Sequence, residues 1–419
     1  MDIVRLAARS LYNRRYTAWL TLLSIALGVA LMLGVEKVRL GAKTSFANTL
    51  SGADLIVGAR SGAIPLLLYS VFRIGNATNN IDWQSYQAIA HYPAVRWTIP
   101  LSLGDSHRGF RVLGTNRDYF EHYRYARQRP LEFSAGQPFD DVYDAVLGAD
   151  VADKLGYRLG QSIVLSHGID SAGLAKHDDR PFRVVGILKR TGTPVDRTVH
   201  ISLAGIEAIH VDWQSGARIP GAAVSAEQAR AMDLTPRTLT AFLIGLDSKR
   251  HVFSMQRAIN EYRPEPLLAI LPGVTLQELW DMMSVAENAL LGVSVGVVVS
   301  SLLGLLTVIL AGLHERRREM AILRSVGATP WHIVTLLVTE ATLLASCGVL
   351  CGVGLLYLLL WIAQPVIESH WGLYIVIAPP TGREFILMAL TVGAGCLAGL
   401  LPAWLAYRYS LADGMTVRV

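Results

Sequence analysis

The sequence predicts an α-helical membrane protein with four transmembrane helices, arranged one plus three, and a large mixed α/β extracytoplasmic domain inserted between helices 1 and 2. Three observations lead to this fold class. Four predominantly apolar stretches are each long enough to cross a bilayer core of about 30 Å at about 1.5 Å per helical residue. One long hydrophilic interval, residues 36–285, separates the first stretch from the other three. Within it, short apolar or alternating runs are separated by Gly, Asp, Asn or Pro, which is typical of strands.

The apolar stretches and the charged residues between them set the expected segments of the chain. These are a cytoplasmic amphipathic helix at 1–15, transmembrane helix 1 at 16–35, an outer domain with stalks and two subdomains at 36–285, transmembrane helix 2 at 286–313, a short cytoplasmic helix at 314–330, transmembrane helix 3 at 331–363, an outer loop at 364–382, transmembrane helix 4 at 383–407 and a cytoplasmic tail at 408–419. Arg316, Arg317 and Arg318 assign the 314–330 segment to the cytoplasmic side by the positive-inside bias, so both termini are expected in the cytoplasm.

Composition excludes several function classes. The chain has 419 residues, a formal net charge of +5, 52% hydrophobic residues and only 17% charged residues. The basic residues cluster at membrane borders, so nucleic-acid binding is a poor explanation for the positive charge. No predicted span carries Asp, Lys or Arg in its middle, Glu340 being the nearest candidate. An ion-coupled carrier usually needs such groups, and we therefore disfavour that class.

The first span is flanked by charge on both sides. Arg5, Arg9 and further arginines lie opposite apolar residues in 1–16, which predicts a helix on the inner membrane surface. Glu36, Lys37 and Arg39 follow the span on its expected outer side, against the positive-inside bias. The positive-inside bias has little effect on a long translocated domain, so we expect the end of span 1 near residue 36 to lie on the outer side of the membrane.

The outer domain is expected to be mixed α/β. Residues 38–50 and 276–289 predict helical stalks that continue spans 1 and 2. Strands are expected at 51–58, 95–99, 110–113, 145–148, 162–165, 182–188 and 238–246, and helices at 83–91, 149–155 and 251–262, with Asp82 as an N-cap. The apolar segment 64–72 is too short to span a membrane, and it is either buried core or an exposed patch.

Small residues recur every four positions in span 2, at Gly292, Gly296, Ser300 and Gly304. This spacing places them on one helix face and permits close approach of another helix. Gly348 and Gly352 in span 3, and the pair 395 and 399 in span 4, repeat the spacing. The span 2 stripe predicts either packing within the bundle or a seam between two copies, and the sequence does not separate these alternatives.

No catalytic or metal-binding residues are predicted. The 419 residues hold no Gly-x4-Gly-Lys-Ser/Thr phosphate loop and no Gly-x-Ser-x-Gly elbow. His314 and Glu315 begin like a zinc-helix motif, but Arg318 stands where the second histidine is needed. His177, with two aspartates after it, predicts a solvated loop. A membrane-anchored enzyme is thus disfavoured, and we expect the chain to bind no cofactor itself.

Residues 315–328, with the sequence ERRREMAILRSVGA, are similar to the coupling-helix signature of MacB-type ABC permeases, the superfamily that includes the Lol lipoprotein-release permeases and FtsX. Residues 14–29 resemble the family's first span. Residues 147–156 with 182–187 look like its periplasmic core domain, and 400–406 resemble the end of its last span. The tail 410–417 departs from the usual proline-containing ending, which leaves tail contacts open.

The resemblance implies a permease in the inner membrane of a bacterial cell, with a periplasmic outer domain. It implies two copies of a separate ABC ATPase, which binds ATP and Mg, and a second permease chain, identical or homologous. The residues implied to contact the ATPase are Glu315, Arg316, Arg317, Arg318, Glu319, Met320, Leu323, Arg324 and Gly327. A periplasmic adaptor or substrate protein is a further partner that the family allows.

Two functions remain open under this resemblance. The first is export or extraction of a lipoprotein, a peptide or a hydrophobic compound, driven by mechanical coupling to the ATPase. The second is an FtsX-like signalling subunit that activates a periplasmic hydrolase. The large outer domain favours the first function, because FtsX-like chains usually have a much smaller one.

Overall fold

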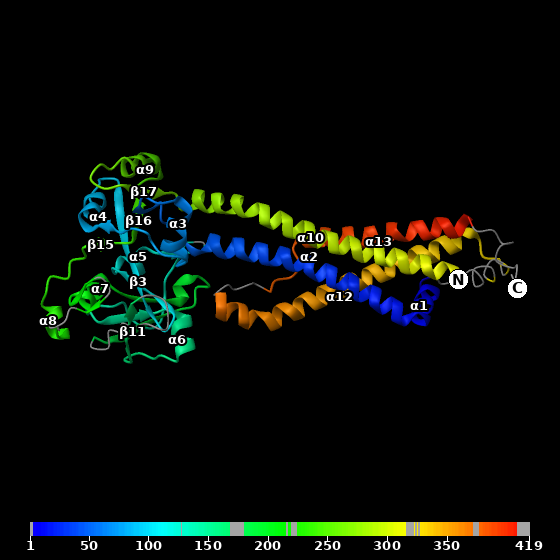
Figure 1. Cartoon of the computed structure of the whole chain (residues 1–419), viewed down its shortest axis with the longest axis horizontal. Coiled ribbons are helices and arrows are strands. Elements are labelled where there is room, and N and C mark those ends of the chain that lie inside the picture. Colours follow the sequence, from blue (N-terminus) through cyan, green and yellow to red (C-terminus); the bar gives the residue numbers. More distant parts are fainter. Residues whose placement is uncertain are drawn as a thin grey trace. The chain divides into compact units, whose positions relative to one another are not determined.

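The computed structural model describes residues 3–126, 128–167, 180–214, 217–218, 224–315, 322, 325, 327–371 and 377–408. The chain divides into two compact units. Unit 1 comprises Met1–Ala42, Ser284–His370 and Ile375–Val419, and unit 2 comprises Lys43–Met283 and Trp371–Tyr374. We describe each unit by itself, with the elements labelled in Figure 1.

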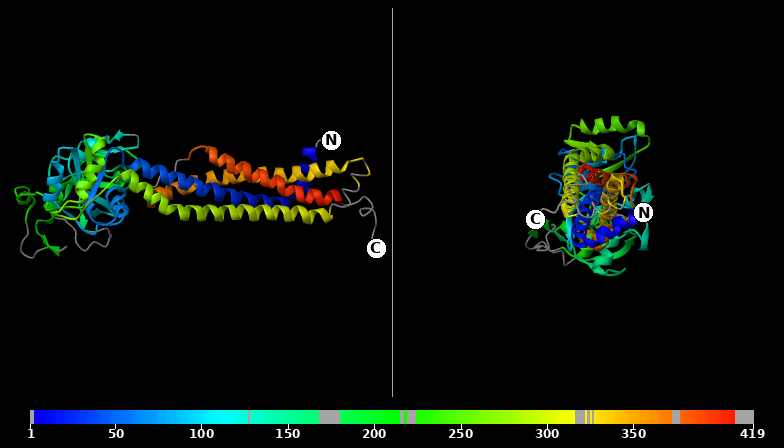
Figure 2. Two further views of the ribbon diagram at one scale, coloured as in Figure 1. Left: turned by 90° about the horizontal axis from the view of Figure 1, so that it is seen from above. Right: turned by 90° about the vertical axis from the view of Figure 1, so that its right-hand side faces the viewer.

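Unit 1 is built from long apolar helices that run side by side (Figure 2). Its helices are α1 (Ile3–Asn13), α2 (Arg15–Thr49), α10 (Pro272–Glu315), α12 (Pro330–Trp371) and α13 (Gly382–Arg408), of which α2 and α10 each contribute residues to both units. Among the described residues, four helices are long and apolar enough to cross a membrane, namely α2, α10, α12 and α13. This agrees with the one-plus-three arrangement, although α12 continues to Trp371, beyond the expected end at 363.

Glycines let these helices approach closely at several points. A Cβ added to Gly348 or Gly352 of α12 would collide with Ile25 or Val29 of α2. A Cβ at Gly395 or Gly399 of α13 would likewise collide with an alanine of α12, Ala345 or Ala341 respectively. The small residues therefore set the separation of α12 from its two neighbours, and Leu, Ile and Val side chains between the helices form the apolar core of unit 1.

Unit 2 is organised around a sheet. Among the described residues, eleven strands form one hydrogen-bonded sheet whose main path runs β17-β1-β16-β3-β4-β12-β8-β11-β7, with β10 paired to β3 and β9 to β11. These strands are β1 (Leu55–Ala59), β3 (Val95–His107), β4 (Phe110–Thr115), β7 (Phe133–Gly136), β8 (Asp144–Leu147), β9 (Ser162–Ile163), β10 (Ser166–His167), β11 (Phe182–Leu188), β12 (Thr198–Ser202), β16 (Ala241–Leu246) and β17 (Leu267–Ile270). Short two-stranded pairs join β2 (Ile81–Asp82) to β15 (Thr238–Leu239), β5 (Arg124–Tyr125) to β6 (Arg129–Pro130), and β13 (Trp213–Gln214) to β14 (Ala217–Arg218).

The long strand β3 joins two halves of this sheet. Its first part pairs antiparallel with β16, from Val95 to Leu101, and its second part pairs antiparallel with β4. The register shifts between Leu103 and Ser106, which marks a bulge at the point where the strand passes from one half to the other. The β4–β12 and β8–β11 pairs are parallel, so the second half is a mixed sheet.

Both faces of the sheet are buried, because successive strand residues point to opposite faces. In β1, Leu55 and Val57 belong to one apolar cluster, and Ile56 belongs to another on the opposite face. The covering helices are α3 (Ala63–Leu67), the π-helical turn η1 (Leu68–Phe72) and α5 (Asp118–His122) on the Ile56 face, and α4 (Trp83–Ala90), α6 (Ala149–Leu155), α7 (Leu203–His210), α8 (Ala226–Arg230) and α9 (Val252–Asn260) on the opposite face. Two short 3₁₀ turns, η2 (Pro194–Arg197) and η3 (Lys249–His251), complete the unit.

The apolar segment 64–72 is core. Leu66, Leu67 and Tyr69 are almost fully buried and pack against the sheet through α3 and η1. Gly58 of β1 makes room for them, since a Cβ there would lie 2.5 Å from a methyl group of Leu66. Of the two alternatives left open by the sequence, buried core is therefore correct.

Most expected elements are present, with changes at their ends. The helix expected at 149–155 and the strand expected at 182–188 have those bounds, and α2 continues to Thr49, as expected for the first stalk. The N-cap prediction for Asp82 is wrong in one respect: Asp82 precedes α4 in an extended conformation, but its side chain makes no capping hydrogen bond. Its backbone N–H instead donates to the Glu265 carboxylate.

Candidate functional site

Most of the residues implied to contact an ATPase lie outside the described residues: Arg316, Arg317, Arg318, Glu319, Met320, Leu323 and Arg324. The backbone of Glu315 ends α10. Gly327 has a φ of +99°, a left-handed conformation that favours glycine, and α12 begins at Pro330. The end of α10 and the start of α12 thus lie within one or two residues of the bounds expected for the 314–330 segment.

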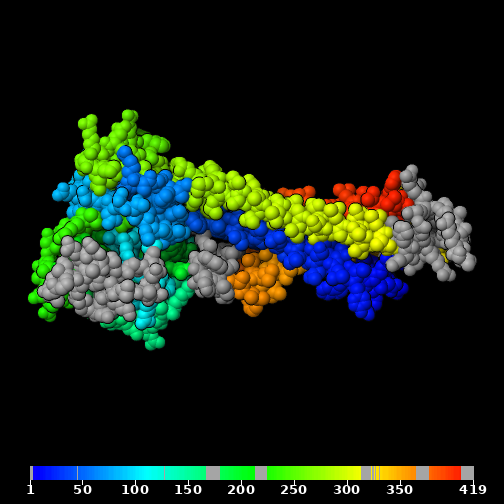
Figure 3. Space-filling model, viewed as in Figure 1, coloured from blue at the N-terminus to red at the C-terminus, as the bar shows by residue number. Residues whose placement is uncertain are grey.

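The small-residue stripe of α10 faces outward within unit 1. Gly292, Gly296, Ser300 and Gly304 are all exposed, and a Cβ added at any of the three glycines would meet no described atom within 4 Å. The face of α10 that packs on the bundle is instead the one carrying Leu305, and the space-filling view displays α10 along the outside (Figure 3). Packing within the described part of the bundle therefore does not explain this stripe.

Helices α2 and α10 are joined by polar contacts in the middle of the apolar region and near the end of α10. The Ser301 hydroxyl lies 3.1 Å from the Ser24 hydroxyl and 3.0 Å from the Ser24 carbonyl oxygen. Near the end of α10, the Arg14 guanidinium donates to the Gly312 carbonyl at 3.4 Å. Gly28 permits the close approach at the middle contact, because a Cβ there would lie 3.3 Å from the Ser301 hydroxyl.

A charged cluster joins the same helices at the other end. We call it the clasp, and it consists of Glu36, Lys37, Arg39, Glu287, Arg383 and Glu384. Arg39 of α2 donates to Glu287 of α10 at 2.6 Å, and it also pairs with Glu36 at 3.3 Å. Arg383 of α13 lies 3.4 Å from Glu36. The clasp therefore links α2 to both α10 and α13.

The buried centre of the clasp is the pair Lys37 and Glu384. The Lys37 ammonium lies 3.3 Å from the Glu384 carboxylate, and the two side chains are only 6% and 2% exposed. Lys37 also donates to the Ala378 carbonyl at 2.9 Å and lies 5.7 Å from the centre of the Tyr357 ring. Buried charges of this kind are retained only when they are paired and hydrogen-bonded, as they are here.

Glu384 also organises the start of α13. Its Oε2 accepts the backbone N–H of Thr381 at 2.8 Å, and its own N–H lies 3.4 Å from the Thr381 hydroxyl, a reciprocal arrangement found at helix N-termini. Sequence reasoning missed the clasp. The available signal was the run of charges after span 1, which opposes the positive-inside bias and so calls for partners.

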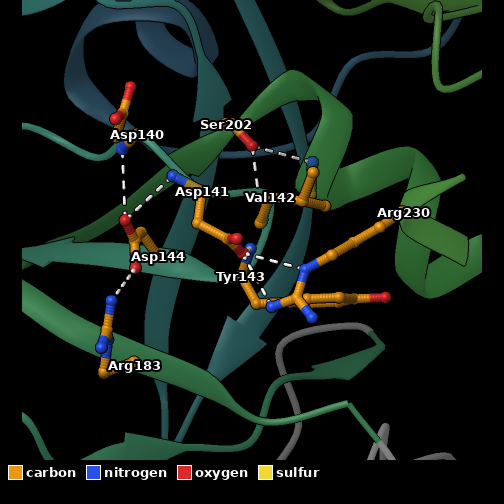
Figure 4. A network of polar contacts seen from close by, with 9 residues as sticks. Asp140, Asp141, Val142, Tyr143, Asp144, Arg183, Ser202 and Arg230 are labelled. Atoms are coloured by element: carbon orange, nitrogen blue, oxygen red, sulfur yellow. Dashed lines mark hydrogen bonds and ion pairs between the residues drawn. The ribbon is translucent and has the colours of Figure 1, made fainter. Parts of the chain in front are cut away.

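A second polar network lies in unit 2, where the 140–144 turn leads into β8 (Figure 4). The Asp144 carboxylate accepts the backbone N–H groups of Asp140 and Asp141 at 3.2 and 3.0 Å, and Arg183 approaches its other oxygen at 3.4 Å. Arg230 of α8 pairs with Asp141 at 3.0 Å and lies over the Tyr143 ring. Burial raises the pKa of Asp141, but the Tyr143 N–H and Arg230 outweigh it and lower this pKa. The network orders the turn and docks α8, and it has no arrangement of a catalytic kind.

One group among the described residues has metal-ligand chemistry. Asp118, Glu121 and His122 of α5 place one ligand atom each within 4.8 Å of one another. Glu121 is exposed, and the His122 ring stacks on Trp97 with 5.3 Å between ring centroids. Exposed groups at helical spacing commonly lie this close without a metal, so we assign no metal centre to them. The His177 loop considered above lies outside the described residues.

Two family models match this chain. The model described as MacB-like periplasmic core domain matches residues 18–241, which is more than half of the chain. The model described as FtsX-like permease C-terminal matches residues 291–412. The first match includes most of α2 and most of the sheet of unit 2, and the second includes α12, α13 and most of α10.

Curated relatives align over nearly the whole chain. The macrolide export ATP-binding/permease protein MacB of Marinobacter nauticus is 23% identical over 436 residues, which covers 97% of this chain and 58% of the relative. The pyoverdine export ATP-binding/permease protein PvdT of Pseudomonas syringae pv. tomato is 22% identical, covering 99% of this chain and 59% of the relative. The chain thus spans less than two thirds of the length of these relatives.

Among solved structures, the periplasmic region of MacB from Actinobacillus actinomycetemcomitans matches with a TM-score of 0.33 and 10% identity. The match covers 54% of this chain and 93% of that one.

Proposed function

This chain belongs to the MacB/FtsX-type ABC transporter permeases, which are multi-pass membrane proteins, and we propose that it couples ATP hydrolysis by a separate ATPase subunit to conformational change in unit 2. The main support for the proposal is the set of polar contacts between α2 and α10. Both helices contribute residues to unit 1 and to unit 2, and within unit 1 they are joined at Arg14, Ser301 and Arg39. Helices tied in this way move together, which supports transmission of a displacement along them.

The segment 314–330 is the proposed contact with the ATPase. Met320 and Leu323 would bury in a groove of that subunit, with a contribution of roughly 1.5–3 kcal/mol for each fully buried side chain. Arg316, Arg317 and Arg318 would meet an acidic rim, which favours the correct partner and orientation. The proposal places nucleotide binding on a separate ABC ATPase subunit, present in two copies.

The exposed stripe of α10 is the proposed seam with a second permease chain, identical or homologous. Exposed small residues at Gly292, Gly296 and Gly304 allow another helix to approach closely in the membrane, where packing rather than the hydrophobic effect drives association. Two permease chains and two ATPase copies would then form the transporter. ATP-driven closure would push the two 314–330 segments together.

The proposed location is the inner membrane of a bacterial cell, with both termini in the cytoplasm and unit 2 in the periplasm. The relatives are named for export of a macrolide and of pyoverdine. By analogy, the proposed cargo is a hydrophobic compound, a peptide or a lipoprotein, taken up at or beyond the outer leaflet. A periplasmic adaptor would be a further partner.

The FtsX-like alternative, in which the chain activates a periplasmic hydrolase and moves no cargo, draws support from the FtsX-like match at 291–412. The match of the MacB-like periplasmic core model to 18–241 favours transport. Measurement of cargo release from the membrane, against activation of cell-wall hydrolysis, distinguishes the two functions.

The test of the proposed coupling is ATPase stimulation. The permease is purified in mild detergent with the ATPase that co-purifies, and ATP turnover is measured with the native chain and with Met320→Asp or Leu323→Asp. We expect the variants to abolish stimulation while unit 2 keeps its circular dichroism signal. Ser325→Asp, on the exposed Ser325 of the same segment, is the matched control. Normal stimulation by Leu323→Asp would refute the docking role.

A further inference from the structure

Unit 2 contains a cavity of about 550 Å³ that the proposed coupling does not use. It lies between the bulge of β3, helix α7 and the segment 232–238. Its walls are mixed. Leu103, Ile206, Met232 and Leu234 supply apolar surface, while carboxylates and two cationic side chains supply polar surface. A volume of this size lies within the range of sites for small organic molecules.

The charges on the walls favour a cation. Three carboxylates line the cavity, from Asp105 of β3, Glu207 of α7 and Asp233, against two cationic groups, His210 and Arg237. All three carboxylates have partners within the chain, and Glu207 accepts the backbone N–H of Arg237. Asp105 is 2% exposed and lies 3.6 Å from His210, and Asp233 accepts the hydroxyl and backbone N–H of Thr235.

The His210 ring shows why Asp105 is not available to a ligand. Its Nδ1 lies 2.8 Å from the Ile206 carbonyl oxygen, which can only accept, so Nδ1 carries a proton. Its Nε2 faces the Asp105 carboxylate, which also accepts, so both nitrogens need protons. Burial opposes this state, yet Asp105 and the Ile206 carbonyl outweigh it and raise the pKa of His210. The pair is therefore an ion pair built into the wall.

Glu207 is the carboxylate best placed to receive a ligand. It is half-buried, and burial raises its pKa although the Arg237 backbone N–H and nearby His210 and Arg237 charges act in the opposite sense. A half-buried carboxylate gains from a further cation in contact with it, because the surrounding protein replaces the water that would otherwise stabilise its charge.

We propose that this cavity binds a small organic cation, a molecule whose ammonium group contacts Glu207 and whose carbon skeleton contacts the apolar wall. The cavity opens where β3 passes between the two halves of the sheet, so an occupant touches α7 of the second half and Thr238, which pairs with β2 beside the first half. This inference concerns binding alone and does not depend on the coupling proposed above.

Binding is expected to depend on pH through the groups that face the ligand. As pH falls toward the raised pKa of Glu207, protonation of this carboxylate removes the attraction, and the charged state of His210 and Arg237 opposes a cation. As pH rises through the raised pKa of His210, this side chain loses its proton and leaves the Asp105 charge uncompensated, which strengthens the attraction. Affinity should therefore increase from low to high pH, with Asp233 charged throughout.

The test is calorimetric titration of the full chain in mild detergent with butylammonium, putrescine and spermidine, and with butanol as the uncharged comparison. We expect the ammonium probes to bind and butanol not to bind. Glu207→Gln should weaken the affinity by about tenfold or more, the scale expected for loss of one charge-assisted contact. Glu227→Gln, on an exposed carboxylate of α8 outside the cavity, should leave the affinity unchanged.

A second variant keeps the inference falsifiable if Glu207→Gln perturbs folding. Arg237→Gln removes an exposed cation from the cavity wall, so it should tighten the binding of ammonium probes. Weaker binding by this variant would show that the cavity takes an anion or a zwitterion and would overturn the proposal. Failure of all three ammonium probes to bind the native chain, or native affinity in a folded Glu207→Gln variant, would overturn it equally.

Discussion

The Lys37 ammonium and the Glu384 carboxylate lie 3.3 Å apart and join α2 to the first turn of α13, although the two residues are 347 positions apart in the sequence. Both side chains are almost fully buried. The pair therefore connects a helix shared by both units to the last helix of unit 1, at the end where Arg39 also holds α10.

Lys37→Met should strongly destabilise unit 1. It leaves the Glu384 carboxylate buried without its cation, and removal of one partner of a buried pair typically costs about 3–5 kcal/mol. The measurement is the thermal unfolding temperature of the full chain in detergent. Arg383→Gln is the matched control, because Arg383 is 54% exposed and its pair with Glu36 should contribute little.

The double variant Lys37→Met with Glu384→Gln should recover part of this loss, because it removes the uncompensated charge. Equal unfolding temperatures for the native chain and Lys37→Met would mean that the pair does not hold α2 to α13.

Cysteines at Gly292 and Gly296 should cross-link two permease chains. Both positions are exposed on the stripe of α10, and close helix approach brings equivalent residues of two copies near each other. The native Cys347, Cys351 and Cys396 are first replaced by alanine. The readout is a dimer band after mild oxidation in membranes.

Ser301→Cys is the control for this experiment, since Ser301 is buried against Ser24 within one chain and should not cross-link. Cross-linking that is absent at the glycines, or equal at the glycines and at Ser301, would argue against the seam.

His200 should make the opening of unit 2 pH-dependent. Burial, assisted by Arg73, lowers the pKa of His200 to about 3, below its ordinary value of about 6.5. Between these two pKa values the unfolded chain has His200 protonated, whereas the folded chain keeps it neutral. The contribution of His200 to the free energy of unfolding is therefore fully present above about pH 6.5 and decreases as pH falls toward 3. Between pH 7 and pH 4 the loss should be about 3 kcal/mol.

Hydrogen exchange at the β12 amides of the full chain measures this free energy of opening. His200→Gln should remove most of the pH dependence, whereas His251→Gln, at an exposed position, should retain it. Identical pH profiles for the native chain and His200→Gln would contradict the assignment of this dependence to His200.

The side of the membrane on which 314–330 lies is testable in intact cells. A single cysteine at Ser325, an exposed position, should react with a membrane-permeant maleimide and resist an impermeant one. A cysteine at Glu227, on α8, should react with both once the outer membrane is permeabilised. Reaction of the Ser325 position with the impermeant reagent would place the segment outside, beyond the reach of any ATPase.

Local pattern predicted much of the fold. Apolar length indicated the four long helices, and the short helix α6 has the expected bounds 149–155. The strand expected at 95–99 is shorter than the observed strand, because β3 continues through a bulge to His107. Its length is set by β16 and β4, partners that a local pattern does not reveal.

The candidate site was less predictable, because it depends on contacts between distant segments. Glycines at the same spacing pack closely in α12 and α13 but are exposed in α10. The spacing of the glycines in the sequence does not predict this difference. The clasp was missed for the same reason. In the sequence, Lys37 is only an exception to the positive-inside bias, and its partner Glu384 is distant along the chain. The cavity of unit 2 likewise arises from residues of four separated segments.

Deuterium uptake of unit 2 in the complex with the ATPase tests the central claim most directly. Uptake is compared between the nucleotide-free complex and the complex trapped with ATP and vanadate, for the native chain and for Leu323→Asp. Coupling predicts that trapping changes uptake within residues 43–283 of the native chain, and that Leu323→Asp abolishes this change while the ATPase still binds nucleotide. Unchanged uptake in the native chain, or the same change in both chains, would contradict transmission of ATP-driven motion through this permease.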